Sequence, residues 1–360
     1  MTLTHLRLSQ FRSWESLRLE LDSRPMAIYG ANGSGKTNIL ESLSMLAPGR
    51  GLRGASAADQ ARQGVGAGWR IRARVDDHDI ATGAADGGVR EVTLDEKPST
   101  QVALGDVLRV IWLVPAMDRL WTEAPEGRRR FLDRLTLSFI PGHAEDSLAY
   151  DRAMRERNRL LRDQVQDPAW YRALESQMAD AGAAITRHRL DAIDLIARAQ
   201  ADGMTQFPAA TLTLLPGEGF ADDPAPDSIA ERLARFRSRD MGAGRSLTGP
   251  HRADLGAHWG PQEMPAALSS TGEQKALLLS LILANARALA SEIPVLLLDE
   301  VAAHLDGDRR AMLYDEIAAL SAQAFLTGTG PELFDSLSDR ARMVEIRRED
   351  AVSAATERTP

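Results

Sequence analysis

The sequence contains no cysteine, and this absence excludes disulfide bonds, thiolate metal sites and cysteine nucleophiles. It also contains no run of about 18 apolar residues that could span a membrane. The N-terminus, MTLTHLRLSQ, lacks the apolar core of a secretion signal. We therefore expect a cytoplasmic protein with no membrane partner.

An excess of positive charge is absent as well. The formal net charge is −8, which argues against a uniformly basic protein that coats DNA. A local basic face is still compatible with this value, because the field at a surface depends on where the charges lie. The remaining composition, 44% hydrophobic and 26% charged over 360 residues, is typical of a globular chain long enough for two lobes.

Strand-forming patterns occupy two separate parts of the chain. Alternating segments predict a hairpin before residue 23 and an antiparallel meander from Trp69 to about Lys97. From about 117 to 240 the pattern is helical, and strands resume only at ADLGAHWG. No internal repeat and no long heptad pattern is visible. Strand-rich flanks are thus expected to enclose a helical insertion.

The stretch GANGSGKT fits the pattern G-x-x-x-x-G-K-[ST] between a predicted strand and a predicted helix. Its glycines let backbone N–H groups face phosphate oxygens, and the helix dipole adds positive potential there. Lys36 would reach the β- and γ-phosphates of ATP, while Thr37 would give Mg²⁺ a hydroxyl ligand. The alternative is a glycine-rich turn without a ligand. The predicted nucleotide-binding residues of this loop are Gly30, Ala31, Asn32, Gly33, Ser34, Gly35, Lys36 and Thr37.

A second apolar strand, PVLLLDE, ends in two carboxylates. This pattern matches a Walker B element, in which Asp299 would hold Mg²⁺ and Glu300 would act as general base toward the attacking water. Many core strands also end in acidic residues that only cap a helix. The phosphate-binding stretch GANGSGKT, hereafter the P-loop, favours the catalytic interpretation of these two carboxylates.

The stretch SSTGEQK opens an apolar helix, and Ser270 followed by Glu273 forms a capping box. A well-capped core helix is therefore the simpler interpretation. The same residues also resemble the Ser-Gly-Gly-Gln signature of the ABC ATPase superfamily, with Thr271 in place of the first glycine. The segment AHLD, which ends at Asp306, resembles the D-loop of that superfamily. The resemblance implies that Ser270 and Gly272 cap the γ-phosphate of an ATP bound to a second subunit.

Other segments resemble the RecF family of bacterial recombination-mediator ATPases over nearly the whole chain. The matching segments are LRLSQFRSW, GKTNILESL, RRRFLD, NRLL and GPHR. The chain departs from the family pattern at Gln10, where asparagine is usual, and at Ala116 and Met117, which replace Glu-Asp.

The resemblance implies an α/β fold, namely a two-lobed ABC-type P-loop ATPase head with a mixed sheet and a helical insertion. We expect lobe I to comprise residues 1–115 and 241–347, lobe II residues 116–240, and a frayed tail residues 348–360. The implied function is ATP-driven dimerisation on DNA at single-strand gaps or duplex junctions during DNA repair and replication. The implied partners are RecO, RecR and, indirectly, the RecA recombinase, with slow DNA-stimulated ATP hydrolysis.

Clustered arginines provide candidate contacts to DNA phosphates. They are Arg128, Arg129, Arg130, Arg155 and Arg159. The alternative is a solvated face balanced by neighbouring carboxylates such as Glu126 and Glu156.

Several smaller assignments complete the predicted site. Arg12 could reach the nucleotide from the N-terminal turn, as matching arginines do in related repair ATPases, and Asn38 could assist at the phosphates. Thr327 or Thr329 would occupy the γ-phosphate-sensing position, and His251 has a structural role. Two rival functions stay open: a transporter-type ATPase subunit, and an ABC head that binds ATP without hydrolysis.

Overall fold

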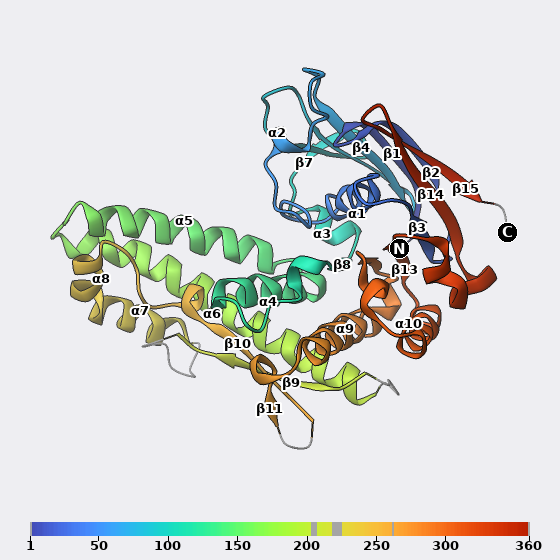
Figure 1. The fold of residues 1–360 in the computed structure, drawn as a ribbon. Coiled ribbons are helices and arrows are strands. Elements are labelled where there is room, and N and C mark those ends of the chain that lie inside the picture. Colours follow the sequence, from blue (N-terminus) through green and yellow to red (C-terminus); the bar gives the residue numbers. More distant parts are fainter. Residues whose placement is uncertain (1, 203–206, 218–224, 261–262, 359–360) are drawn as a thin grey trace. The chain divides into compact units, whose positions relative to one another are not determined.

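The computed structural model describes residues 2–202, 207–217, 225–260 and 263–358 (Figure 1). The chain divides into two compact units. Unit 1 comprises Met1–Asp118, Gly203–Phe207 and Leu278–Pro360, and unit 2 comprises Arg119–Asp202 and Pro208–Leu277. None of the described helices is long and apolar enough to cross a membrane.

Unit 1 contains a six-stranded sheet in the order β15-β14-β3-β13-β12-β8, in which only β15 is antiparallel. Its strands are β3 (Met26–Tyr29), β8 (Val110–Leu113), β12 (Val295–Leu298), β13 (Gln323–Gly328), β14 (Arg342–Glu349) and β15 (Val352–Arg358). Every residue of β3, β8, β12 and β13 is buried. Continuous apolar strands of this kind are typical of parallel sheets covered on both faces.

A second sheet of unit 1 is antiparallel, in the order β2-β1-β4-β5-β6-β7. Its strands are β1 (Leu3–Phe11), β2 (Trp14–Glu20), β4 (Trp69–Val75), β5 (His78–Ala84), β6 (Glu91–Leu94) and β7 (Lys97–Ser99). Buried and exposed residues alternate along β1 and β4, so one face of this sheet packs on the core and the other meets solvent. The predicted N-terminal hairpin and the predicted meander are both confirmed.

The helices of unit 1 include α1, which begins at the P-loop. They are α1 (Lys36–Ser44), α2 (Ala57–Gln60), α3 (Leu104–Val107) and α10 (Gly307–Ala319), with the 3₁₀ segments η1 (Pro115–Met117), η4 (Ala290–Glu292), η5 (Val301–His304) and η6 (Pro331–Arg340). Helix α9 (Thr271–Ala288) begins in unit 2 and ends in unit 1, because the boundary falls at Leu277.

Unit 2 is mostly helical, as the sequence predicts for residues 117 to 240. Its helices are α4 (Pro125–Phe139), α5 (His143–Arg162), α6 (Pro168–Ala201), α7 (Pro226–Arg235) and α8 (Arg237–Ala243), with η2 (Pro250–Arg252) and η3 (Ala266–Leu268). Proline at the first position of α4, α6 and α7 suits a helix start, where the missing N–H has no partner to lose. The long helices α5 and α6 lie side by side (Figure 1). Tyr150, Met178, Ile185 and Leu233 belong to the core that they enclose.

The boundaries of the two units differ from the expected lobes. Residues 241–277 belong to unit 2, because β10 (Asp254–Trp259) pairs along its whole length with β9 (Ala210–Leu215), and β11 (Met264–Pro265) completes that sheet. The sequence interpretation missed β9, since the short segment ATLTLL lies within a long helical region.

The expectation of a frayed tail is wrong for the described residues 348–358. These residues complete β14 and form β15, which pairs with β14 from Glu349↔Val352 to Met343↔Arg358. The turn uses Asp350 and Ala351, both with positive φ (47° and 66°), as a two-residue hairpin connection requires. Ala351 is an uncommon residue for that conformation, so the turn leaves a weak signal in the sequence.

Candidate nucleotide-binding site

The P-loop connects the carboxyl end of β3 to the first turn of α1. Gly30, Gly33 and Gly35 have positive φ values of 153°, 76° and 111°. At Gly35 the requirement for glycine is also steric, because a Cβ there would lie 2.5 Å from Ser353 Oγ and 2.7 Å from Ser13 Oγ. The loop therefore depends on backbone conformations that favour glycine, and at Gly35 it packs tightly against Ser13 and Ser353. Asn32 and Ala31 are exposed at its tip, whereas Ser34 is buried.

The Lys36 side chain folds back across this loop. Its Nζ donates hydrogen bonds to the carbonyl oxygens of Gly30 (2.8 Å) and Ala31 (3.0 Å), and the residue is only 3% exposed. Burial lowers the pKa of the Lys36 ammonium, while the carboxylates of Glu300 and Asp299 act in the opposite direction. The Lys36 ammonium is therefore held against the carbonyl oxygens of the P-loop.

Asp299 connects residues that lie at or just beyond the ends of three neighbouring strands of the parallel sheet, β3, β13 and β12. It follows the buried strand β12, and its Oδ1 accepts hydrogen bonds from Thr37 Oγ1 (3.0 Å) and Thr327 Oγ1 (2.7 Å). Thr37 lies in the first turn of α1, which follows β3 in the chain. Thr327 lies in β13, the strand between β3 and β12. Because these strands are parallel and adjacent, their carboxyl ends lie along one edge of the sheet, where ligands bind in open α/β folds.

Glu300 has a strained backbone that the same threonine supports. Its φ is 53°, in the left-handed region, and its N–H donates to Thr327 Oγ1 at 2.9 Å. Thr327 thus fixes both Walker B residues, the first through its carboxylate and the second through its backbone. The sequence offered Thr327 and Thr329 as equal candidates for this position, and the structure brings Thr327 to Asp299.

A divalent cation fits the oxygen donors at this point. The Thr37 hydroxyl and the Asp299 carboxylate meet at the N-terminus of α1, beside the P-loop glycines, and a helix N-terminus favours an anion such as a phosphate. Hydroxyl and carboxylate oxygens are the ligands that Mg²⁺ prefers, with phosphate oxygens completing the set. Thr37 and Asp299 are the residues of this chain that would hold the ion.

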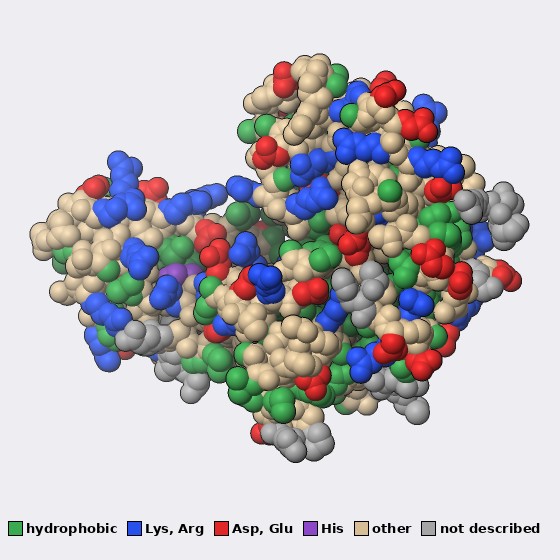
Figure 2. Space-filling view, viewed as in Figure 1, with side chains coloured by type: hydrophobic (Ala, Val, Ile, Leu, Met, Phe, Trp, Pro, Cys, Tyr) green, Lys and Arg blue, Asp and Glu red, His purple; other side chains and the backbone are tan. Residues whose placement is uncertain are grey.

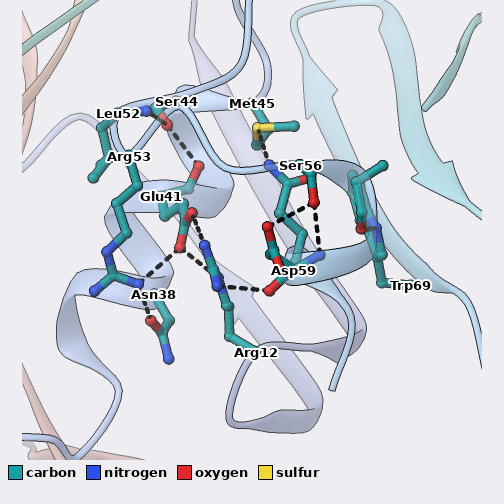
Figure 3. Close-up of polar contacts among 12 residues, drawn as sticks. Arg12, Asn38, Glu41, Ser44, Met45, Leu52, Arg53, Ser56, Asp59 and Trp69 are labelled. Carbon is teal, nitrogen blue, oxygen red and sulfur yellow. Dashed lines mark hydrogen bonds and ion pairs between the residues drawn. The ribbon is translucent and has the colours of Figure 1, made fainter. Parts of the chain in front are cut away.

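A buried carboxylate on α1 organises the surrounding arginines (Figure 3). Glu41 is fully buried and accepts from Arg12 Nε (2.9 Å), Arg12 Nη2 (2.6 Å) and Arg53 Nη1 (2.9 Å). Arg12 also donates to the carbonyl of Asp59, and Arg53 donates to Asn38 Oδ1 at 2.8 Å. Arg12 was expected to reach the nucleotide; here its guanidinium is bound to α1 through Glu41. Glu41 was not among the predicted site residues, although a carboxylate one turn beyond Thr37 in an apolar helix is a signal in the sequence.

The residues that pack behind the P-loop were not predicted from the sequence either. Ser353 Oγ lies 2.6 Å from the carbonyl of Ser34 and 2.7 Å from Ser13 Oγ, and Arg348 Nη1 donates to the carbonyl of Gly33 at 3.1 Å. Asn38 Nδ2 donates to Ser13 Oγ at 2.8 Å. These contacts come from the turn after β1 and from the C-terminal hairpin, neither of which has a motif of its own.

The predicted capping box at the start of α9 is confirmed. Ser270 N and Oγ lie 2.8 and 2.7 Å from Glu273 Oε2, and Glu273 N donates back to Ser270 Oγ at 3.4 Å. Ser270, Thr271 and Gly272 are exposed, so the first turn of this helix faces solvent. Asp306, the last residue of the predicted D-loop, caps α10 by accepting from Arg309 N at 2.8 Å. The side chains of Ala303 and His304 lie outside the described set.

The five candidate DNA-contacting arginines divide into two groups. Arg128 forms a two-bond ion pair with Asp254 (2.8 Å for both bonds), and Arg129 donates to the carbonyl of Ala253 at 2.9 Å. Both guanidinium groups therefore hold α4 against β10. In contrast, Arg130, Arg155 and Arg159 are exposed.

His251 has a structural environment. Its Nδ1 lies 2.8 Å from Tyr150 Oη and its Nε2 lies 3.2 Å from the carbonyl of Ser246. Burial lowers the pKa of His251 to about 4. The contacts suit a neutral ring that donates from Nε2 and accepts from the tyrosine at Nδ1.

The P-loop, the carboxylates after β12 and the capped helix α9, together with the mixed sheet and the mostly helical second unit, define an ABC-type ATPase head, and the residues that the structure describes form no long coiled coil. Residues 2–353 match the family model described as the RecF/RecN/SMC N-terminal domain. The curated protein "DNA replication and repair protein RecF" of Caulobacter vibrioides is 46% identical over 374 residues, covering 96% of each chain. Its counterpart in Mesorhizobium japonicum is 44% identical with the same coverage. This chain belongs to the RecF family.

Solved structures agree with this fold. A structure described as the recombination mediator protein RecF with ATP in the RecFOR pathway matches with a TM-score of 0.84 and 21% identity, over 98% of this chain and 97% of that one. An Smc head bound to the C-winged helix domain of ScpA matches with a TM-score of 0.60 and 15% identity, over 100% and 98%.

Proposed function

We propose that this protein is an ATP-dependent DNA-binding protein of recombinational repair, which uses ATP as a switch for dimerisation on DNA. The observation that carries the proposal is the convergence of Thr37 and Thr327 on Asp299 at the edge of the parallel sheet. This arrangement joins the P-loop, the Walker B strand and a γ-phosphate-sensing position through one carboxylate. It supports the assignment of a Mg-ATP site, and the curated relatives from Caulobacter vibrioides and Mesorhizobium japonicum are named for DNA replication and repair.

In this proposal each of the predicted nucleotide-site residues in unit 1 has a defined role. The backbone N–H groups of the P-loop and the Lys36 ammonium bind the phosphates, and Thr37 with Asp299 holds Mg²⁺. Bound Mg²⁺ would neutralise charge on the β- and γ-phosphates during phosphoryl transfer. The Glu300 carboxylate takes a proton from the attacking water, and Thr327 keeps both acidic residues in position.

The exposed first turn of α9 supports a shared site. Ser270 and Gly272 lie at a helix N-terminus, which favours an anion. We propose that they cap the γ-phosphate bound by a second copy of the chain, with Asp306 at the same dimer interface. Two copies would then enclose two ATP molecules.

We further propose that the dimer engages duplex DNA at single-strand gaps or junctions and assists RecO and RecR in loading RecA. The solved relatives described as acting in the RecFOR pathway support this assignment. Of the predicted DNA contacts, Arg130, Arg155 and Arg159 are the ones with exposed side chains. Arg128 and Arg129 are better explained by their bonds to Asp254 and Ala253.

A gel-shift series with gapped, duplex and single-stranded DNA, with and without ATP, tests the proposal. The wild type should shift gapped or duplex DNA only when ATP is present. Lys36→Met should abolish ATP-dependent DNA binding, because it removes the charge that binds the phosphates. DNA binding by this variant with its ATP dependence intact would contradict the role of the P-loop.

The second candidate is an ABC head that binds ATP without turnover, and the exposed signature turn is equally compatible with it. Glu300→Gln separates the two functions. In a hydrolysing switch this variant should accumulate as an ATP-locked dimer, because the general base is lost and the binding residues remain. In a non-hydrolysing head it should behave like the wild type. Membership of the RecF family leaves the transporter-subunit interpretation without support.

A further inference from the structure

The solvent-facing side of the antiparallel sheet carries a row of like charges. In the strand register, Arg18 of β2 lies opposite Arg7 of β1, and Arg7 lies opposite Arg72 of β4. The next row places Arg70 opposite Ser9. Side chains directly opposite on neighbouring strands lie about 5 Å apart, and like charges in such pairs are destabilising.

Acidic side chains do not neutralise this row. Arg7, Arg18, Arg70 and Arg72 are exposed, and none of the four has an ion pair or a hydrogen bond to a side chain within the parts of the chain that the structure describes. Glu91 lies on the same face, but Gly83 separates it from Arg70 in the register.

The adjacent row along the same strands behaves differently. There, His5 Nε2 contacts Glu20 at 2.7 Å and Arg74 contacts Asp79 at 2.8 Å. The absence of partners is thus specific to one part of the face. In a chain of net charge −8, four such arginines on one sheet are a local departure from the overall balance.

The arginines surround a hollow in the sheet surface. Two adjoining depressions of about 690 and 590 Å³ share Arg7, Arg70 and Arg72 in their linings. Glu91 lines the first depression, and Asp79 and Glu96 line the second, away from the shared arginine row. The hollow exists because β5 contributes only small residues here, Ala81 and Gly83. Figure 2 shows Lys and Arg side chains, with Asp and Glu side chains among them, over the part of the molecule that contains β1, β2 and β4.

We propose that this face of the antiparallel sheet binds the phosphate backbone of duplex DNA, a proposal that rests on the DNA-binding function proposed above. Guanidinium groups suit phosphate oxygens, and the hydroxyls of Ser9 and Ser16 add neutral hydrogen-bond donors on the same rows. The face presents no exposed aromatic side chain among its described residues, whereas sites for single strands stack bases on aromatics. This absence favours the duplex over a single strand.

The test uses the full chain with ATP and a blunt duplex, with affinity measured by fluorescence anisotropy over a range of salt concentrations. The variant is Arg7→Gln with Arg72→Gln. Removing two facing like charges should leave the melting temperature equal to or above that of the wild type. The matched control is Arg24→Gln with Arg340→Gln, which removes the same charge from exposed arginines paired with Asp22 and Asp315.

If each arginine neutralises one phosphate, the plot of log K against log [salt] should become shallower by about 2 in the variant, since each contact contributes about 0.9. The Kd at ~0.1 M salt should rise on the order of tenfold or more. The control should keep the wild-type slope.

An unchanged slope and Kd for duplex DNA, in a wild type that binds duplex with ATP, would overturn this inference alone. Weakened binding of single-stranded DNA without an effect on duplex would also overturn it. If the wild type binds no DNA under any nucleotide condition, the proposed function fails, and this inference fails with it.

Discussion

Thr327 is the residue whose removal should separate ATP binding from hydrolysis most cleanly. Its hydroxyl donates to Asp299 Oδ1 at 2.7 Å and accepts from Glu300 N at 2.9 Å, and its side chain is 1% exposed. Thr327→Val keeps the branched shape and removes both bonds. Thr327→Ser keeps the hydroxyl and is the matched control.

The expected magnitude follows from the two bonds. A hydrogen bond to a charged group contributes about 1.5–3 kcal/mol and a neutral one about 0.5–1.5 kcal/mol. Their sum, roughly 2–4.5 kcal/mol, corresponds to about 30- to 2,000-fold in rate if it is felt only in the transition state. Asp299 retains its bond from Thr37, so we expect a value near the lower end.

The assay is steady-state ATP hydrolysis with duplex DNA, together with ATP binding at equilibrium. Thr327→Val should hydrolyse ATP on the order of 30-fold more slowly and bind it with an affinity within about threefold of the wild type, because the P-loop and Lys36 are untouched. Thr327→Ser should stay near the wild-type rate. A valine variant that hydrolyses ATP at the wild-type rate would refute the positioning role of Thr327.

Three further predictions concern the dimer, the stability and the pH response. Ser270→Arg should leave ATP binding by the monomer intact and prevent ATP-driven dimerisation, and a normal dimer in sedimentation would contradict the shared site. Arg157→Met should lower the free energy of unfolding in urea by about 3–5 kcal/mol, because Arg157 is fully buried and its loss leaves the carboxylates of Glu175 and Asp240 without that partner; a loss below 1 kcal/mol would contradict this. The pKa of His251 is depressed to about 4 in the folded state, so its contribution to stability is complete above about 6.5 and is lost as the pH falls toward 4. His251→Asn should therefore flatten the stability profile between pH 6.5 and 4, and a profile parallel to that of the wild type would count against the assignment.

The sequence predicted the parts of the site that a single short motif encodes. The P-loop and the Walker B strand have fixed spacings that follow from phosphate and Mg²⁺ chemistry. The capping box needs only Ser270 and Glu273 on one turn. Each of these predictions depends on contacts within a few residues.

The supporting contacts could not be predicted, because they join distant parts of the chain. The partners of the P-loop include Ser353 and Arg348, and Arg12 binds Glu41, where the sequence predicted a contact with the nucleotide. For the same reason, the sequence could not distinguish buried arginines from exposed ones. Arg128 and Arg157 resembled their exposed neighbours in sequence, and only the fold places Arg128 opposite Asp254 and Arg157 in the core.

The packing behind the P-loop has a consequence for the order in which this protein becomes competent. The hydroxyls of Ser13 and Ser353 meet 2.7 Å apart at Gly35, across a sequence separation of 340 residues. During synthesis, Ser353 follows Ser13 by 340 residues, so the two hydroxyls cannot meet until the later segment has been made. The phosphate-binding loop is therefore synthesised long before the contacts that pack behind it can form.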